Sequence, residues 1–179
     1  CLKDLKKKIN SKTRAIIPVH LYGIPSDMIG LKKICKNKNI KIIEDCAQAH
    51  GTRINKKHVG TFGDIGTFSF YFSHHITTVE GGMIVTNNDY IADKIKSLRS
   101  HGWTRDMENI KQYSKFSSII DPRFLFVNVG YNLRSSDLNA SIGIEQLKKL
   151  KRFNESRHMI GNMWNNAFQE LKNDGDLMP

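Results

Sequence analysis

Short apolar runs rich in β-branched and aromatic residues recur along the first half of the chain, separated by polar stretches. Such runs predict strands, and they occur at residues 15–19, 40–45, 66–72 and 83–86. Between the first two, Asp27 precedes residues that are apolar at helical spacing, which predicts an N-capped helix to about residue 39. The order strand, helix, strand predicts a parallel unit. The sequence therefore favours an α/β fold with a mostly parallel sheet.

Helical periodicity marks the remaining elements. Residues 1–10 resemble the end of an amphipathic helix, and Asn88 precedes a helix to about Ser100. A helix is predicted to start at Ser136–Asp137, and a second covers roughly 153–171. The residues expected to face inward are Ile91, Ile95, Leu98, Leu138, Ile142, Ile144 and Leu147. We interpret the chain as a fragment of a longer α/β protein, with 1–150 in a large domain and 151–179 leading out of it.

The stretch from 66 to 82 carries the candidate chemistry. Residues 68–72 are aromatic at nearly every position, with Ser69 as the small polar exception, which predicts a strand covered on both faces. The loop that follows contains His74 and His75, and ligands of α/β sheets bind outside the ends of strands. Asp45 closes another predicted strand. Taken alone, its position favours a helix or turn cap over a functional role.

Composition narrows the functional classes. The net charge of +11 comes mainly from lysines set among Asn and Ile, without an RNA-binding or recognition-helix motif, so no nucleic-acid partner is expected. A positive field can still attract a diphosphate-bearing substrate. No apolar run approaches the length of a membrane span, so no membrane contact and a cytoplasmic location are expected.

Metal sites and disulfides are also not expected. The three cysteines form no C-x-x-C pair. Side chains of the adjacent His74 and His75 diverge in an extended loop, which disfavours joint metal ligation. The glycines at 60, 63 and 66 lack the spacing of a dinucleotide fingerprint.

Several motifs together resemble the DegT/StrS-type sugar aminotransferases, which are pyridoxal-phosphate enzymes of fold type I acting on nucleotide-linked keto sugars. The motifs are His20–Gly23, Ile43–Gly51, Val59–Asp64, Phe68–Tyr71, Glu80–Gly82, His101–Gly102 and Gly130–Arg134. The resemblance covers essentially the whole chain, but only the middle of a member about twice as long. It implies the three-layer large domain of these enzymes, present here as a fragment.

The resemblance also implies residue roles. Asp45 matches the carboxylate that pairs with the protonated pyridine nitrogen, and Gln48 matches the residue that contacts the ring hydroxyl. Ser69 matches a ligand of the cofactor phosphate. Asn132 matches the asparagine that reaches the partner's cofactor phosphate, which implies a homodimer with shared active sites.

His74 departs from the aminotransferase pattern, because it occupies the place of the lysine that forms a Schiff base with the cofactor. An imidazole cannot form that bond, but it can accept a proton near neutral pH. This substitution resembles the GDP-4-keto-6-deoxymannose 3-dehydratase branch, which implies pyridoxamine phosphate as cofactor, His74 as base, loss of the C3 hydroxyl and glutamate as amino donor. The implied context is deoxysugar and lipopolysaccharide biosynthesis. His75 is assigned to orientation or substrate contact, with a structural role as the alternative.

Of three other interpretations, the first is disfavoured and the other two remain open. A related branch has histidine at this position and an iron–sulfur cluster, but no cysteine follows Cys46 here. An aminotransferase could recruit another lysine, and Lys56 and Lys57 lie in the nearby turn-rich segment. A protein of this fold could also bind the cofactor for regulation without turnover.

Overall fold

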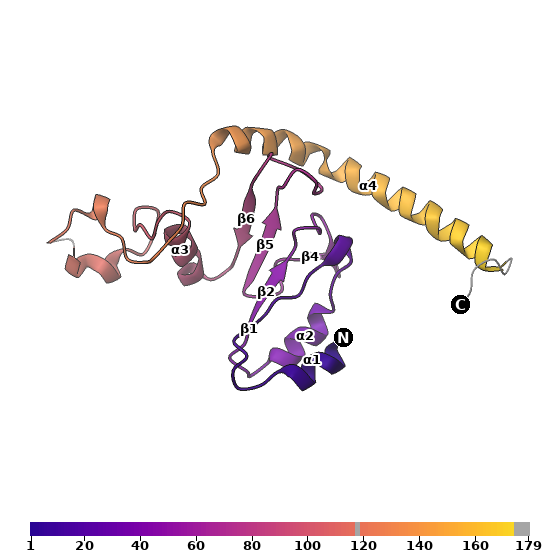
Figure 1. Ribbon diagram of the computed structural model, residues 1–179, viewed down its shortest axis with the longest axis horizontal. Coiled ribbons are helices and arrows are strands. Elements are labelled where there is room, and N and C mark those ends of the chain that lie inside the picture. Colours follow the sequence, from indigo (N-terminus) through magenta and orange to yellow (C-terminus); the bar gives the residue numbers. More distant parts are fainter. Residues whose placement is uncertain (117–118, 174–179) are drawn as a thin grey trace.

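The computed structural model describes residues 1–116 and 119–173, and a mixed sheet lies at its centre (Figure 1). The strand order is β1-β2-β5-β6. β1, β2 and β5 run parallel, whereas β6 is antiparallel to β5. The bounds are β1 Ala15–Ile16, β2 Lys41–Asp45, β5 Ile65–Ser69 and β6 Gly82–Val85. The predicted α/β class with a mostly parallel sheet is confirmed, and all four predicted strands are present.

Helix α2 (Met28–Cys35) covers the sheet near β1 and β2. The Asp27 carboxylate accepts a hydrogen bond from the Gly30 amide at 2.8 Å, so the predicted N-cap is present. Met28, Leu31 and Cys35 are buried with Ile42 of β2. Helix α1 (Leu2–Lys8) packs on this cluster through Leu2 and Leu5.

The segment between β2 and β5 contains a short antiparallel hairpin that sequence periodicity did not reveal. Its strands are β3 (Arg53–Ile54) and β4 (Lys57–His58). The short helices η1, η2 and η3 cover Leu21–Gly23, Lys111–Phe116 and Pro122–Phe124. The last two lie in the poorly periodic segment that follows α3.

Helix α3 (Asp89–Leu98) has the predicted cap, since Asn88 Oδ1 accepts the Ile91 amide at 3.0 Å. Its buried face differs from the prediction. Asp93 and Ser97 are buried, whereas the three predicted apolar residues are only partly buried. The Asp93 carboxylate accepts the amides of Glu108 and Asn109, each at 2.9 Å, because the segment after the helix folds back over its polar side.

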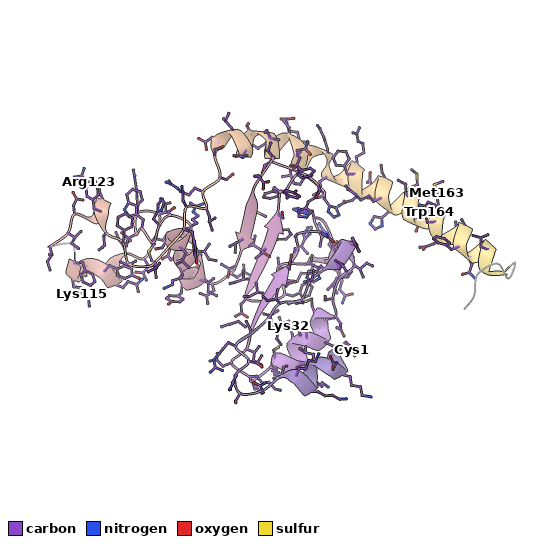
Figure 2. All side chains as sticks on the ribbon, in the orientation of Figure 1. Cys1, Lys32, Lys115, Arg123, Met163 and Trp164 are labelled. Atoms are coloured by element: carbon purple, nitrogen blue, oxygen red, sulfur yellow. The ribbon has the colours of Figure 1, made fainter. Side chains whose placement is uncertain are left out.

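Helix α4 (Asp137–Asn173) is a single helix of 37 residues, so the prediction of two helices is wrong. No proline or glycine lies between positions 148 and 156, and nothing local interrupts the backbone hydrogen bonds. The four residues predicted to face inward are exposed, Leu138 by 79% and Ile142 by 40%. The helix extends well beyond the sheet, and Met163 and Trp164 lie on that extension (Figure 2). It crosses the predicted boundary at 150, and that domain assignment stays a prediction.

The aromatic strand is shorter than predicted. β5 ends at Ser69, Tyr71 is exposed, and Phe72 is 65% exposed. The chain turns here because Ser69 Oγ accepts the Tyr71 amide at 3.2 Å and the Tyr71 carbonyl accepts the His74 amide at 3.1 Å. The sheet covered on both faces therefore does not extend to Phe72. Within the described ranges, no helix combines the length and apolarity that crossing a membrane requires.

Candidate active site

Asp45 and Ser69 lie at the carboxyl ends of two adjacent parallel strands. Asp45 pairs with Thr67 in the β2–β5 register, and Ser69 follows two positions later on the same face as Thr67. Asp45 Oδ1 accepts the Ala47 amide at 3.0 Å, which orients the carboxylate. The Ser69 hydroxyl accepts the Tyr71 amide and keeps its own proton for donation. An acid and a hydroxyl donor therefore lie together at the sheet edge where α/β folds bind ligands.

Gln48 lies in the turn after β2 and is held by the loop that follows β1. Its Oε1 accepts the backbone amide of Tyr22 at 3.0 Å. Tyr22 has φ of 54°, a left-handed conformation that non-glycine residues rarely adopt. Because a backbone N–H can only donate, the carbonyl of the Gln48 side chain faces Tyr22. The side-chain NH₂ is then left to donate elsewhere.

His74 and His75 follow β5 in a loop closed by backbone hydrogen bonds. The Phe70 amide donates to the Gly81 carbonyl at 2.9 Å, and the Thr78 amide donates to the Phe70 carbonyl at 2.9 Å. The His74 ring meets the Tyr71 ring edge-on, with centroids 5.7 Å apart. His74 Nδ1 is buried and has no hydrogen-bond partner among the described residues. An imidazole nitrogen that is not committed to the protein therefore lies just beyond β5.

A third histidine, His50, lies beside this loop. Its side chain is buried and contacts Phe68, Phe70 and His75, with ring centroids 5.4, 5.6 and 5.7 Å away. Neither ring nitrogen has a hydrogen-bond partner in the part of the chain that the structure describes. Its position five residues after Asp45 was visible in the sequence, but its proximity to the loop arises only from the fold.

The pKa values of His50 and His75 favour neutral imidazoles. Burial, followed by the nearby His75 and His74, lowers the pKa of His50 to about 4. Burial also lowers the pKa of His75, with smaller contributions from Arg157 and His74. Both rings are therefore neutral near pH 7 and place no positive charge beside the histidine loop.

Helix α4 holds the loops of the site from above (Figure 1). Asn139 donates from Nδ2 to the carbonyls of Thr78 and Glu80, at 2.6 and 3.3 Å. Asn154 donates from Nδ2 to the His50 carbonyl at 2.9 Å. The helix therefore bridges the histidine loop and the turn that carries Gln48.

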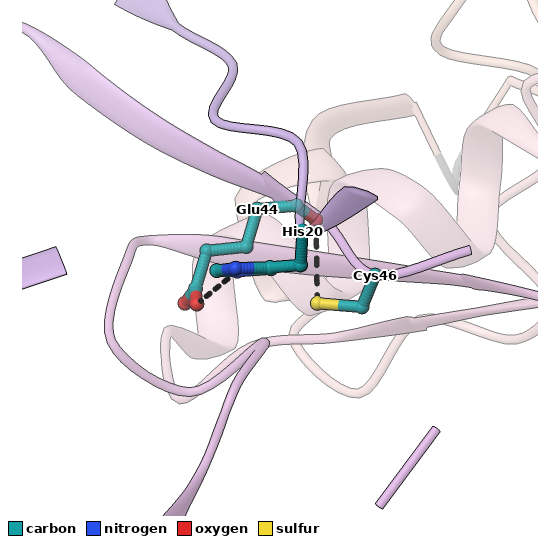
Figure 3. A group of neighbouring side chains, drawn as sticks. All are labelled: His20, Glu44 and Cys46. Carbon is teal, nitrogen blue, oxygen red and sulfur yellow. Dashed lines mark hydrogen bonds and ion pairs between the residues drawn. The ribbon is translucent and has the colours of Figure 1, made fainter. Parts of the chain in front are cut away.

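A buried polar cluster lies beneath the site, and Figure 3 shows the His20 ring turned toward the Glu44 carboxylate. His20 and Glu44 are both fully buried, and His20 Nε2 lies 3.1 Å from Glu44 Oε2. Burial by itself would raise the pKa of Glu44. Hydrogen bonds from His20 and from the amides of Gly63, Gly60 and Phe62 outweigh that effect and hold the pKa below its usual range.

Cys46 lies next to this pair and completes a group whose potential ligand atoms lie within 4.8 Å of one another. Burial, with the charges of Glu44 and Asp45, raises the pKa of Cys46 to about 12, so its thiol stays protonated. The His20 and Glu44 atoms already participate in protein hydrogen bonds. We therefore interpret the group as a hydrogen-bonded core.

The other residues that the sequence analysis singled out lie outside the group formed by Asp45, Gln48, Ser69 and the histidine loop. Asn132 is exposed and its backbone bridges to Ser100 after α3. Among the described residues, Asn132 forms no hydrogen bond with Asp45 or Ser69. Its predicted role toward a partner subunit stays a prediction. Lys56 and Lys57 are exposed on the β3–β4 hairpin, where the Lys57 ammonium lies 4.8 Å from the centre of the Phe62 ring.

Comparison with known proteins places this geometry among its relatives. The model of the DegT/DnrJ/EryC1/StrS aminotransferase family matches residues 1–178. A GDP-4-keto-6-deoxy-D-mannose 3-dehydratase of Yersinia pseudotuberculosis is 41% identical over 169 residues, which are 93% of this chain and 43% of the relative. A GDP-perosamine synthase of Vibrio cholerae is 37% identical over 170 residues, 95% of this chain and 42% of the relative.

Solved structures confirm the fold class. The E. coli GDP-4-keto-6-deoxy-D-mannose-3-dehydratase with bound hydrated PLP superposes with a TM-score of 0.81 at 36% identity, covering 94% of this chain and 44% of that one. The chain thus spans less than half the length of the relatives that it matches. The match over nearly all of its residues shows that the chain belongs to the DegT/DnrJ/EryC1/StrS aminotransferase family.

Proposed function

We propose that this chain forms the cofactor-binding part of an enzyme that uses pyridoxal or pyridoxamine phosphate to remove the C3 hydroxyl of a nucleotide-linked 4-keto-6-deoxy sugar. The observation that carries the proposal is His74. It lies five residues after Ser69, beyond the strand next to Asp45, and its Nδ1 is buried without a hydrogen-bond partner in the ranges that the structure describes. The dehydratase relative at 41% identity supports this reaction.

The donors and acceptors at the sheet edge fit the cofactor. Asp45 supplies a carboxylate for the protonated ring nitrogen, and Oδ1 of that carboxylate is already oriented by the Ala47 amide. Gln48 supplies an NH₂ donor for the ring oxygen, because its carbonyl is occupied by Tyr22. Ser69 supplies a hydroxyl donor for the phosphate. When bound, the cofactor supplies an electron sink for the reaction.

His74 acts as the proton acceptor in this proposal. Its imidazole cannot bond covalently to an aldehyde as a primary amine does, so the cofactor is held by noncovalent contacts. Proton transfer to a positioned imidazole contributes typically about 10²- to 10⁴-fold to a rate. His75, in ring contact with buried His50, orients this side of the loop.

The finer assignments belong to the same proposal. Glutamate restores the amine form of the cofactor, a second subunit contributes its Asn132, and the net charge of +11 attracts the nucleotide diphosphate. The cytoplasmic location and the role in deoxysugar and lipopolysaccharide biosynthesis remain predictions.

A direct assay tests the reaction. The full-length protein that contains this chain is incubated with pyridoxamine phosphate and GDP-4-keto-6-deoxymannose, with and without glutamate. The products are identified by mass spectrometry. The proposal is supported if a C3-deoxygenated sugar forms and if more than one turnover per enzyme requires glutamate. An aminated sugar that retains its C3 hydroxyl would contradict it. Cofactor binding without turnover of a panel of keto sugars would favour the regulatory alternative.

The second candidate, an aminotransferase, is favoured by the 37% identity to a GDP-perosamine synthase. It requires a lysine that bonds to the cofactor, and Lys56 or Lys57 would have to supply it. Borohydride reduction with pyridoxal phosphate, followed by peptide mapping, separates the two candidates. The dehydratase proposal expects no pyridoxyl-lysine at either position. It expects such an adduct at position 74 in His74→Lys, but not at position 75 in the matched control His75→Lys.

A further inference from the structure

The buried His20–Glu44 pair connects three segments beneath the site. His20 Nδ1 accepts the Ser26 amide at 3.1 Å, so this nitrogen carries no proton and Nε2–H is the donor to Glu44. The backbone amide of His20 donates to the Asp45 carbonyl at 3.0 Å. His20 therefore ties the loop after β1 to β2 through both its backbone and its side chain, and Figure 3 shows the side-chain bond to Glu44.

Glu44 extends this connection to the turn before β5. Its Oε2 also accepts the Gly60 amide at 2.8 Å, and Oε1 accepts the amides of Phe62 and Gly63 at 2.6 and 2.7 Å. A fully buried carboxylate requires such donors, and removing one leaves an uncompensated charge. The position of His20 is therefore strongly determined.

The loop anchored by His20 carries the amide that holds Gln48. Tyr22 lies two residues after His20, and its backbone N–H reaches Gln48 from a left-handed conformation. Thr52 Oγ1 donates to the Gly23 carbonyl at 3.0 Å and holds the other end of the same short helix. The Tyr22 side chain is 78% exposed, so the backbone and not the side chain determines this geometry.

We propose that His20, through its bond to Glu44, is a positioning residue that holds the Tyr22 amide against Gln48 and thereby turns the Gln48 NH₂ toward the ring oxygen of the bound cofactor. This inference rests on the proposed function. It assigns a specific task to a buried pair that does not itself reach the cofactor. Without the anchored loop, the Gln48 amide can rotate and present its oxygen to the ring oxygen, which is repulsive.

The test compares pyridoxamine 5′-phosphate with its 3-deoxy analogue, which lacks the ring oxygen. Dissociation constants are measured by fluorescence titration of the protein. Both ligands carry an amine in place of the aldehyde, so neither can bond covalently to a lysine. We expect the wild type to bind pyridoxamine phosphate about tenfold or more tightly than the analogue, the value of one hydrogen bond to a charged group. In His20→Leu this ratio falls toward one, because the contact at the ring oxygen is lost. Gln48→Met should lower the ratio of the two dissociation constants to the value found in His20→Leu. The double variant should lower this ratio no further.

A merely structural role of His20 would weaken both ligands equally and leave the ratio unchanged. Asp93→Asn is the matched control, since it alters another buried carboxylate that accepts two backbone amides, away from the site. It should keep the wild-type ratio. His20→Gln retains a hydrogen-bond donor for Glu44, so it should keep most of the wild-type preference for pyridoxamine phosphate. If His20→Leu does not fold, Thr52→Val carries the test. It removes the hydrogen bond from Thr52 Oγ1 to the Gly23 carbonyl, which holds the same loop, and Thr52 is only half-buried.

The outcomes separate this inference from the proposed function. A wild type that binds neither ligand overturns the proposed function. A wild type that binds both equally overturns the contact of Gln48 with the ring oxygen, and with it the role of His20. A ratio that His20→Leu and Thr52→Val both leave unchanged overturns only the role of His20.

Discussion

Asn154 of helix α4 donates a hydrogen bond to the backbone carbonyl of His50 at 2.9 Å, across 104 positions of the chain. The neighbouring Gly51 has φ of +87°, and a Cβ there would lie 2.6 Å from Asn154 Nδ2. Only glycine allows the turn to approach the helix so closely. The contact fixes the turn that carries Gln48 against α4.

Replacing Asn154 tests the importance of this contact. In Asn154→Asp a carboxylate faces the His50 carbonyl, so the donor is lost and like partial charges meet. We expect the free energy of unfolding to fall by about 1–3 kcal/mol. Amides of residues 47–51 should exchange faster in hydrogen-exchange mass spectrometry. Asn162→Asp, an exposed position on the same helix, is the matched control and should leave these amides unchanged. Equal exchange in both variants would contradict a role for α4 in holding the turn.

Asp45 provides a test of cofactor binding. Asp45→Asn keeps the acceptor for the Ala47 amide but removes the negative charge expected to face the protonated ring nitrogen. A charge-assisted hydrogen bond contributes about 1.5–3 kcal/mol, so affinity for pyridoxamine phosphate should fall about tenfold or more. Fluorescence titration measures this effect. Unchanged affinity would mean that Asp45 caps its turn and nothing more.

Variants of His74 and of its neighbour His75 distinguish an effect on proton transfer from an effect on cofactor binding. His74→Gln removes the proton acceptor, and the sugar dehydration rate should fall about 10²- to 10⁴-fold while pyridoxamine phosphate still binds. His75→Gln alters the adjacent ring and should affect the rate much less. The comparison uses single-turnover rates with saturating sugar. A rate reduced equally by both changes would show that the loop, and not the imidazole at 74, limits the reaction.

His50 makes stability depend on pH. Its pKa is lowered from 6.5 to about 4 by burial, so the unfolded chain binds a proton in this interval that the folded chain does not. Stability therefore falls as the pH drops from about 6.5 toward 4, by up to about 3 kcal/mol from this group. In His50→Leu this part of the loss disappears. Urea denaturation at pH 7 and pH 4.5 measures it, and parallel pH dependence in wild type and variant would contradict the prediction.

Local signals were sufficient for much of the fold. Asp27 predicted the start of α2 because an N-cap depends only on residues within one turn. The apolar run before Asp45 predicted β2 and placed this carboxylate at the strand end. The roles predicted for Ser69 and His74 came from the resemblance of their motif to the family. Each of these inferences used neighbours in sequence, which the amino-acid order specifies directly.

Other features depended on distant segments. The polar residue Asp93 is buried because residues 108 and 109 fold back onto it, and periodicity alone favoured an apolar face. Helix α4 continues through position 150, where the weak sequence pattern suggested an interruption. His50 enters the site because β5 and the loop after it pack against its ring.

The sequence by itself determined the α/β class and the strand ends that carry Asp45 and Ser69. Its resemblance to the family predicts that His74 stands in the place of a lysine. Only the tertiary structure decided how Gln48 is oriented, that His50 is buried beside His75, and that His20 and Glu44 support the site from below. The physical reason is that hydrogen bonds and burial among segments far apart in the chain depend on three-dimensional packing. Local patterns of polarity carry no information about which distant backbone amide a side chain will meet.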